Sequence, residues 1–554
     1  MRRILNGTAK SGSGEVMGKI KSIFTQFLLC VFFFAGSAIL FAQDEANPNV
    51  ELPDFVITGT DVVNVQKAQK IMPEIVSSIS QSFLKPAFSP EELDIRDLSN
   101  PVKDEIDLFD TLNFLNGNLN AGVGTYLMPV GKFSYSLPFK SGIFEAMAFG
   151  KNQREHIENS AMYNVGGAAN LSFFVDNESA FLPGTQFKLH GDYGISSYRF
   201  YASSVDPSEK RSHNYGNAGL SINNLLSDVI IFGGGFSDDF SSLQDEDFSE
   251  NLLDLNGFAK LELANFSLIA NADYKFQSIT NENVDGQYSF FSVRPAVGLV
   301  FSKVLKAFFG LNYQKVKENS FFSPYASLSF TLNKNISLYG QFAPHADFLT
   351  TGNFLKENPY YDVQTRTRNI FVENQGHYTA AIKYEYDKYF QIDAGAEYTT
   401  SDNMPYYMNS FESGRFVIAT ADAKKIAATL SLLFHPGPFG MFYGNVEFSR
   451  TTDSSGNFLP YSPVIKSNLI YGYNFQFGLN AQVNLEYSSD SYADLANIIE
   501  LNSYIDLGLK FAYKVADNFH LTFALSNLLG NENYRWYGYE ELPLDIVAGF
   551  NYKW

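Results

Sequence analysis

Long stretches of alternating apolar and polar residues constrain this chain more than any other feature. In residues 266–276 every second residue is apolar and the residues between them are mostly polar; residues 305–313, 479–487 and 505–515 repeat the pattern. Successive side chains of a β-strand point to opposite faces, so each stretch predicts a strand with one apolar and one largely polar face. Several stretches approach or exceed ten residues, which is long for a soluble strand of about five or six.

Such strands fit two architectures. A soluble sandwich hides its apolar face inside, whereas a transmembrane barrel turns that face to lipid and lines its lumen with polar groups. Strand length favours the barrel, because a tilted membrane strand needs about 9–11 residues. The 53 Phe and 33 Tyr residues also favour it, since many lie near segment ends, where a membrane interface requires aromatic side chains. We therefore predict an all-β protein, a transmembrane antiparallel β-barrel of about 22 strands (range about 18–22), over residues 112–554.

The N-terminus indicates export. Lys19 and Lys21 precede an apolar run at 23–41, and an acidic stretch follows Ala42. This order is typical of a secretory signal peptide, although a run of about 19 apolar residues also suffices for a transmembrane helix. We predict a signal peptide over residues 1–42, with Met17 as an alternative start. The lone Cys30 lies inside it, so the mature protein is expected to contain no cysteine.

A short acidic segment separates the signal peptide from the first predicted strand. Residues 43–111 contain 14 acidic and 5 basic residues and are interrupted by prolines. The composition predicts an acidic periplasmic tail, and the resemblance of the chain ends to known barrels implies a vestigial plug as the alternative.

The final residues alternate like a closing barrel strand. Apolar residues occupy every second position up to the last one, and they are Ile546, Ala548, Phe550, Tyr552 and Trp554. This ending resembles the terminal strand by which the barrel-assembly machinery recognises outer-membrane clients. The resemblance implies a bacterial outer-membrane location, with the outer-membrane lipid and the barrel-assembly machinery as partners.

Both ends of the chain resemble the TonB-dependent receptors. Residues 518–554 end as such a receptor barrel does, with an alternating strand, then Asn527-Leu528-Leu529, a loop that contains Tyr534, and a closing strand at 544–554. Receptors of this family also carry a globular plug inside the barrel. Residues 43–111 are too few for a full plug, so the resemblance implies a receptor-like barrel with a reduced or missing plug domain.

The second match lies near the mature N-terminus, where residues 52–60 read LPDFVITGT. This stretch resembles the segment of these receptors that includes or adjoins the TonB box. The TonB-box-like residues are Asp54, Phe55, Val56, Ile57 and Thr58. A β-prone run of this kind can add to the sheet edge of a TonB-like or other periplasmic protein through main-chain hydrogen bonds. The alternative is a tail without such a partner.

Motifs for catalysis, metal binding or cofactor binding are scarce. None of the seven His residues shows the paired spacing of a metal site. We find no G-x-S-x-G motif, P-loop or dinucleotide fingerprint. A net charge of −19 argues against a general nucleic-acid binder, which needs a basic face. We therefore expect no enzyme, no cofactor, no metal and no nucleic-acid partner.

The lumen is the surface predicted to contact a solute. The residues expected to point inward are Asn116, Asn118, Asn120, Asn271, Asp273, Asn480, Asn484, Glu486, Asp506 and Lys510. Amide and hydroxyl groups can hydrogen-bond polar solutes, and the net acidity favours cations over anions. The leading hypothesis is passage or uptake of an unknown small polar solute. One alternative is a non-transporting anchor or assembly component whose tail docks a periplasmic partner, and a remote alternative is an outer-membrane hydrolase.

The connections between strands are expected to alternate in length. Residues 332–335 and 516–518 predict short periplasmic turns. Residues 203–213, 241–251 and 353–368 are longer and more polar, and they predict external loops.

Overall fold

The computed structural model describes most of the chain from residue 116 onward. The described residues are 116–176, 182–205, 208–224, 230–263, 266–281, 284–302, 304–333, 335–364, 369–386, 390–410, 413–435 and 440–554. The predicted signal peptide, the acidic segment 43–111 and the TonB-box-like residues lie outside this part.

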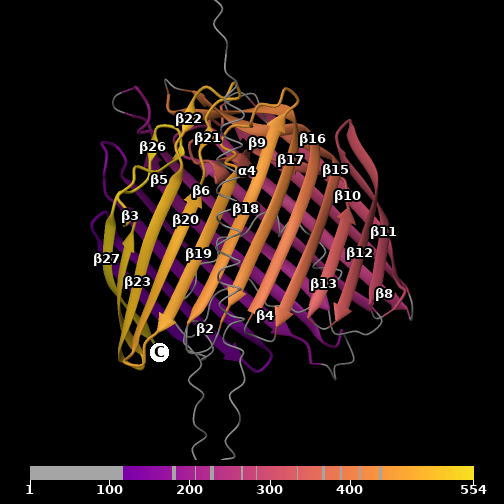
Figure 1. The fold of residues 1–554 in the computed structure, drawn as a ribbon, viewed down its shortest axis with the longest axis horizontal. Helices are drawn as coiled ribbons and strands as arrows, with labels where there is room; N and C mark the ends of the chain where they lie inside the picture. The colour runs from indigo at the N-terminus through magenta and orange to yellow at the C-terminus, as the bar shows by residue number, and fades with distance from the viewer. Residues whose placement is uncertain are drawn as a thin grey trace, which may run out of the picture. The chain divides into compact units, whose positions relative to one another are not determined.

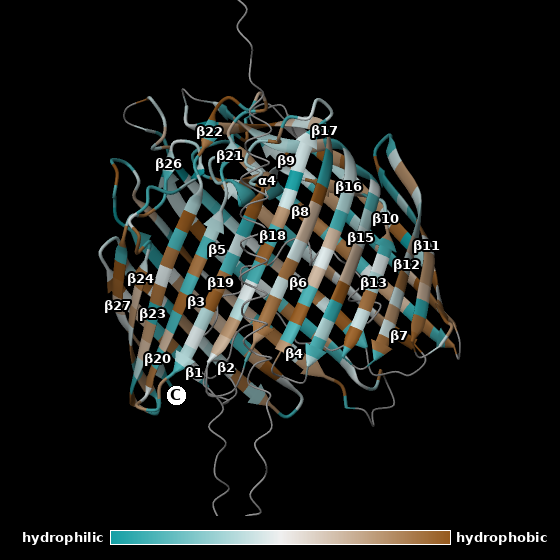
Figure 2. Ribbon diagram, viewed as in Figure 1, coloured by the Kyte–Doolittle hydropathy of each residue, from teal (hydrophilic) through white to brown (hydrophobic). Residues whose placement is uncertain are grey.

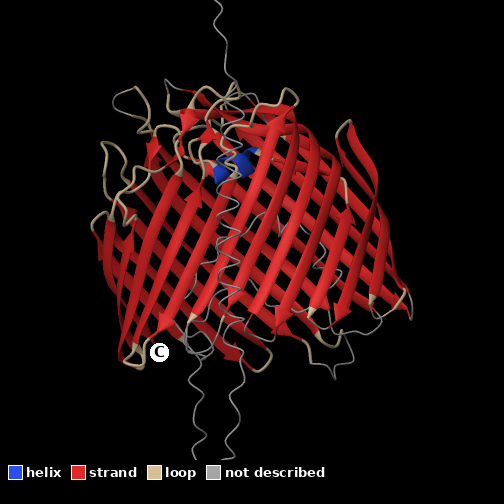
Figure 3. Cartoon of the chain, in the orientation of Figure 1, coloured by secondary structure: helices blue, strands red, loops and turns tan. Residues whose placement is uncertain are grey.

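Strands dominate the described part of the chain (Figure 3). The elements are β1 (Gly117–Gly124), β2 (Leu127–Phe139), β3 (Gly142–Gln153), β4 (Met162–Phe174), β5 (Thr185–Arg199), β6 (Lys210–Asn224), β7 (Ile230–Leu243), β8 (Phe248–Leu263), β9 (Phe266–Asn281), β10 (Val284–Val300), β11 (Leu305–Val316), β12 (Asn319–Asn333), β13 (Ile336–Phe342), β14 (His345–Leu349), α4 (Thr351–Glu357), β15 (Ile370–Tyr386), β16 (Phe390–Ser410), β17 (Arg415–Phe434), β18 (Met441–Asp453), β19 (Ile465–Asn474), β20 (Leu479–Ser488), β21 (Ser491–Tyr492), β22 (Glu500–Leu501), β23 (Tyr504–Ala516), β24 (Phe519–Ser526), β25 (Tyr534–Trp536), β26 (Tyr539–Glu540) and β27 (Asp545–Lys553).

Backbone pairing closes the main sheet into a barrel (Figure 1). Neighbouring strands pair antiparallel, and the last strand, β27, pairs with β1 in a register that places Lys553 opposite Asn118. The amide nitrogen of Gly117 donates to the carbonyl oxygen of Trp554 at 2.9 Å, and the Trp554 amide donates back at 3.0 Å. Because β13 and β14 both pair with β15, the 23 described strands of this sheet occupy 22 positions around the ring. The structure thus confirms the predicted barrel and its strand number.

Apolar side chains cover the outside of the barrel. Figure 2 shows hydrophobic and hydrophilic residues alternating along the strands. On β9, Phe266, Leu268 and Tyr274 are 41–45% exposed, whereas Asp273 and Lys275 point inward and form ion pairs with neighbouring strands. An apolar surface of this extent is stable only against lipid or another apolar partner. Many Phe side chains therefore lie on the lipid-facing side, among them Phe266, Phe309 and Phe322.

Among the described residues, no helix has the length and apolar character needed to cross a bilayer.

The two ends of the barrel differ. We call the end where β1 begins and β27 finishes the terminus end, and the opposite end the mouth. The short turns predicted at 332–335 and 516–518 both lie at the terminus end, where they join β12 to β13 and β23 to β24.

Two predicted external loops are wrong in extent. Residues 241–251 belong mostly to β7 and β8, which are joined by a short turn at 244–247, and the ladder places Ser241 opposite Glu250. Residues 203–213 likewise include the start of β6 at Lys210. In both places the polar residues that suggested a loop continue the strand ladder, and alternate ones face the lumen.

The two faces of one strand should differ sharply in their tolerance of charge. Val483, in the middle of β20, is 38% exposed on the outer face, and the next residue, Asn484, faces the lumen. We expect Val483→Arg to lower the free energy of unfolding in lipid vesicles by about 2–4 kcal/mol, the usual cost of a charge facing the bilayer centre. Asn484→Arg is the matched control and should lower the free energy of unfolding markedly less. Equal losses in a denaturant titration would contradict the assignment of the two faces.

Candidate functional site

The inner wall carries the polar residues that the sequence predicts there. Asp273 pairs with Arg294 at 3.7 Å and Glu486 with Arg535 at 2.7 Å, while Asp506 accepts a hydrogen bond from the amide of Asn527 at 2.7 Å. The other predicted residues on the strands occupy the same inward-facing rows, and they are Asn118, Asn120, Asn271, Asn480, Asn484 and Lys510. Asn116 precedes β1 at the terminus end.

The largest departure from the sequence prediction lies between β13 and β15. Residues 353–368 were expected to form an external loop. Instead, the chain loses its pairing with β12 after Phe342 while β14 stays paired with β15, and α4 then follows inside the ring. We call residues 343–364 the lumen segment. It contains β14 and α4, and Figure 3 shows α4 inside the ring of strands near the mouth.

Inward-facing side chains of β11 and β12 hold the start of the lumen segment. The carbonyl oxygen of Pro344 accepts hydrogen bonds from the Asn312 amide at 2.5 Å and from the Ser323 hydroxyl at 2.9 Å. Gln314 binds both the amide and the carbonyl of Ala346, at 2.5 and 2.8 Å. Phe348 then stacks on Phe290 of β10 with ring centroids 5.8 Å apart. Side chains of β11 and β12 thus replace the backbone ladder on one edge of β14, while its other edge stays paired with β15.

The short helix α4 is fixed at its first turn by a buried carboxylate. Thr350 caps the helix, in a reciprocal capping box with Asn353. Glu250, on the wall strand β8 and only 4% exposed, accepts from the Thr350 hydroxyl at 2.8 Å and from the Gly352 amide at 3.1 Å. The Gln277 amide donates to the same carboxylate at 2.9 Å. A buried acceptor with this many donors is strongly bound, because hydrogen bonds to charged groups are stronger than neutral ones.

The far side of the lumen segment reaches strands β5 and β6. Tyr198 and Arg211 both donate to the carbonyl oxygen of Pro359, at 2.6 and 2.7 Å, and Arg211 also donates to that of Tyr361 at 2.8 Å. Strands β5 and β6 lie far around the ring from β15. The lumen segment therefore spans the interior from one wall to another.

Charged side chains meet across the mouth in what we call the ion cluster, made of Arg211, Arg415, Glu246, Glu209 and Asp362. Glu246, in the β7–β8 turn, binds Arg211 at 2.7 Å and Arg415, the first residue of β17, at 3.1 Å. Arg415 also pairs with Glu209 at 2.6 Å and approaches Asp362 at 3.7 Å.

The ion cluster surrounds an aromatic ring. The guanidinium groups of Arg211 and Arg415 lie 4.6 and 4.3 Å from the centroid of Phe200, which is itself 1% exposed. Removing one partner from such a buried pair is costly because it leaves the other charge uncompensated.

Stacked aromatic rings form a layer at the mouth. Tyr360 of the lumen segment stacks on Tyr539 of β26 at 3.5 Å, and Tyr201 meets the edge of Tyr539 at 4.8 Å. The Tyr201 and Tyr539 hydroxyls donate to the carbonyl oxygens of Glu540 and Gly414 at 2.8 and 2.6 Å. Burial raises the pKa of both hydroxyls, so they remain protonated donors at physiological pH.

No motif in the sequence marks these mouth residues. They come from five parts of the mouth: the lumen segment and the β5–β6, β7–β8, β16–β17 and β24–β27 connections with the strand ends beside them. The only local signal was the Thr350–Asn353 capping box, which marks a helix start and says nothing of its place in the barrel. His345 and His377 illustrate the same point, because their rings lie 5.0 Å apart although 32 positions separate them in the chain. The described residues nevertheless hold no group of three metal-binding side chains.

The residues predicted to form the closing strand lie on β27 or directly after it. Ile546, Tyr552 and Trp554 are 38–40% exposed on the outer face, and Ala548 and Phe550 share their alternation on β27. Trp554 also contacts Phe133 of β2, with ring centroids 5.9 Å apart.

Solved structures with this fold include transporters and receptors. The FrpB iron transporter from Neisseria meningitidis has a TM-score of 0.60 at 11% identity, over 80% of this chain and 82% of that one. The siderophore receptor PiuA from Acinetobacter baumannii gives 0.59 at 12%, over 79% and 81%. The ferric-catecholate import receptor Fiu from E. coli K12 gives 0.60 at 11%, over 80% and 82%. The receptor-like barrel fold that the two ends of the sequence predicted is therefore confirmed.

Comparisons of sequence add nothing to this likeness. No protein-family profile matches the chain, and no curated protein matches it.

Glu250 should control whether the lumen segment stays docked. We expect Glu250→Ala to remove the acceptor for Thr350 and Gly352 and to speed tryptic cleavage after the exposed Lys356 at least tenfold. A hydrogen bond to a charged group contributes about 1.5–3 kcal/mol, and about 1.4 kcal/mol corresponds to a factor of ten. The measurement is the rate of appearance of the fragment ending at Lys356, by mass spectrometry of protein in liposomes.

A control separates docking from general loss of charge. Glu318, an exposed carboxylate in the β11–β12 turn, is changed to Gln in parallel and should leave the cleavage rate unchanged. An unchanged rate in Glu250→Ala would show that Glu250 does not hold α4.

The ion cluster should loosen only in acid. Burial alone would raise the pKa of Glu246, but the guanidinium groups of Arg211 and Arg415 outweigh it and hold this pKa below its usual range. The folded pKa lies below the unfolded one, so the ion pairs stabilise the mouth above the unfolded value, about 4.3, and that stability is lost as pH falls through the lower folded value.

Trp536 offers a local measurement, because it packs against Tyr461 at 4.8 Å and Phe416 at 5.3 Å within the mouth. In a Trp554→Phe background it is the single tryptophan. We expect its fluorescence to change on acidification below about pH 4.3, and this step should disappear in Glu246→Gln. A transition near pH 7, or one that Glu246→Gln leaves intact, would contradict the role of Glu246.

Proposed function

We propose that this protein is an outer-membrane barrel that takes up a small polar solute. The observation that carries the proposal is a closed barrel with an apolar exterior and a lumen lined by amides and paired charges. The likeness in fold to transporters and import receptors supports it. The polar wall would replace part of the solute's hydration shell during passage, and the acidic composition would favour cationic solutes.

The lumen segment would act as the constriction. It crosses the interior and is bonded to wall residues on both sides, including Gln314 and Arg211. The aromatic layer and the ion cluster close the space above it. Passage would therefore require these contacts to open, which makes the present arrangement the closed state of the barrel.

The N-terminal region would supply export and energy coupling in this proposal. Residues 1–42 would direct export, and the acidic segment 43–111 would extend into the periplasm. The run Asp54, Phe55, Val56, Ile57 and Thr58 would add as a strand to a TonB-like partner, in the way extended peptides add to sheet edges. The outward-facing β27, from Ile546 to Trp554, would carry the signal to the barrel-assembly machinery.

Single-channel conductance of the full chain in planar bilayers tests the proposal. We expect the wild-type protein to be nearly silent, because the mouth is closed, and Glu250→Ala to show discrete openings that prefer cations. Glu318→Gln should behave as the wild type does. Deletion of residues 43–111 in both backgrounds measures what the acidic segment contributes to closure.

Solute passage is measured separately by swelling of liposomes in small sugars. A barrel that shows neither conductance nor swelling in Glu250→Ala, with or without residues 43–111, would exclude an uptake role. A non-transporting anchor would then be the remaining interpretation.

A further inference from the structure

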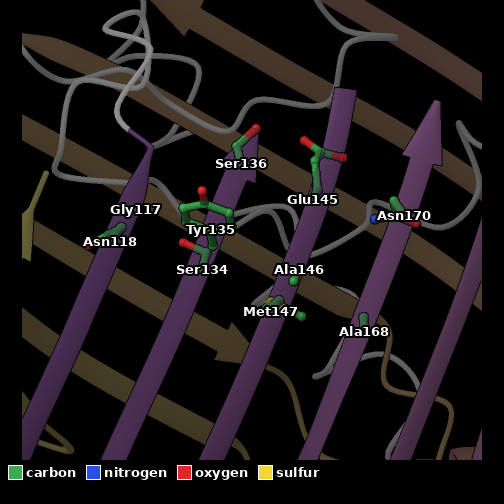
Figure 4. Close-up of a pocket in the computed structure, with 10 residues that line it drawn as sticks. All are labelled: Gly117, Asn118, Ser134, Tyr135, Ser136, Glu145, Ala146, Met147, Ala168 and Asn170. Carbon is green, nitrogen blue, oxygen red and sulfur yellow. The ribbon is translucent and has the colours of Figure 1, made fainter. Parts of the chain in front are cut away.

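The lumen wall is hollowed near the terminus end, away from the mouth and the lumen segment. A cavity of about 310 Å³ lies against the inner face of β1 to β4 (Figure 4). The residues that line it include Tyr135 and the inward-facing polar residues Asn118, Ser134, Ser136, Glu145 and Asn170. A volume of this size is at the lower end of the range for small-molecule sites, roughly 300–1,000 Å³.

The ladder places these side chains in two adjacent rows. In one row Glu145 is opposite Ser136 on one side and Asn170 on the other, so a carboxylate stands between a hydroxyl and an amide. In the next row Asn118 is opposite Ser134. Figure 4 shows Ser136 and Glu145 extending from neighbouring strands in the same direction. Hydrogen-bonding groups of three kinds therefore converge on one hollow.

The hollow exists because a small residue interrupts the second row. Met147 of β3 pairs with Ala168 of β4, so the row ends on a methyl group, whereas the row beside it ends on the longer Asn170. Met147 supplies an apolar surface beside it. One apolar patch with a few convergent polar groups is the usual composition of a ligand site.

Glu145 differs from most other lumenal carboxylates described above. Asp273 and Glu486 are each paired with an arginine, whereas no basic side chain in the described part of the chain forms an ion pair with Glu145. The side-chain oxygen of Asn118 accepts a hydrogen bond from the Asn551 side chain at 2.5 Å, and Asn118 also lines the cavity. Lys132 stands in the row beyond Ser134 and does not line the cavity.

We propose that this cavity binds a small polyhydroxylated solute that carries one ammonium group, such as an amino sugar. The ammonium group would donate to the Glu145 carboxylate, and the solute hydroxyls would bond with Asn118, Asn170 and the two serines. The inference rests on the proposed function and deepens it, since it assigns a class of solute and a resting place inside the lumen. A charge-assisted hydrogen bond to Glu145 would distinguish the amine from its neutral analogue.

Isothermal titration calorimetry of the full chain in detergent, at neutral pH and low salt, tests the assignment. Glucosamine is the probe and glucose its neutral analogue. We expect glucosamine to bind at least tenfold more tightly than glucose. Glu145→Gln should reduce glucosamine affinity about tenfold, to that of glucose, and leave glucose affinity unchanged. Ala168→Leu should fill the cavity and abolish binding of both sugars, with the thermal unfolding midpoint showing that the barrel still folds.

Glu318→Gln is the matched control, because it removes an equal charge outside the lumen, and it should bind as the wild type does. Equal affinity of glucose and glucosamine, no binding to the wild type, or full binding in Glu145→Gln would overturn the assignment. These outcomes are independent of transport. If the barrel conducts but does not bind glucosamine, only the assignment of the cavity is refuted. If it binds glucosamine but does not conduct, only the uptake role is refuted.

Discussion

The closed backbone ladder is the constraint on which the rest of this structure depends. A bilayer offers no water to unpaired N–H and C=O groups, so a strand-based wall must close on itself. Here the closure is made by β1 and β27, down to the reciprocal bonds between Gly117 and Trp554. In the closed ring, successive side chains of each strand point alternately to lipid and to the lumen. Both the apolar exterior and the polar interior follow from that single geometry.

At the start of the lumen segment the backbone pairing with β12 ends, and side chains of β11 and β12 replace it while β14 stays paired with β15. Asn312, Gln314 and Ser323 bind its backbone, and Glu250 holds the start of α4. At the mouth, connections from distant strands contact one another through buried ion pairs and stacked tyrosine rings. A desolvated ion cluster adds little net stability but is intolerant of losing one partner.

Sequence reasoning predicted the barrel well because its signal is local. Alternation in residues 266–276 or 505–515 depends only on neighbouring residues and the pleat of a strand, and the structure forms β9 and β23 there. The same reasoning failed at 241–251 and 353–368, where polar residues were interpreted as external loop. Polar composition is equally compatible with a loop in water and with a strand or segment facing a wet lumen, so composition alone could not distinguish them.

The sequence by itself determined the architecture, the strand number and which residues face lipid. Period-two alternation and strand length depend only on neighbouring residues, so they can be recognised in the sequence. Only the tertiary structure decided where function can reside. It carried the segment after Phe342 into the lumen, brought Glu246 to Arg415 across the mouth, and placed Glu145 between Ser136 and Asn170. These are contacts between residues far apart in sequence, and they arise from ring closure and strand register, which no local pattern encodes.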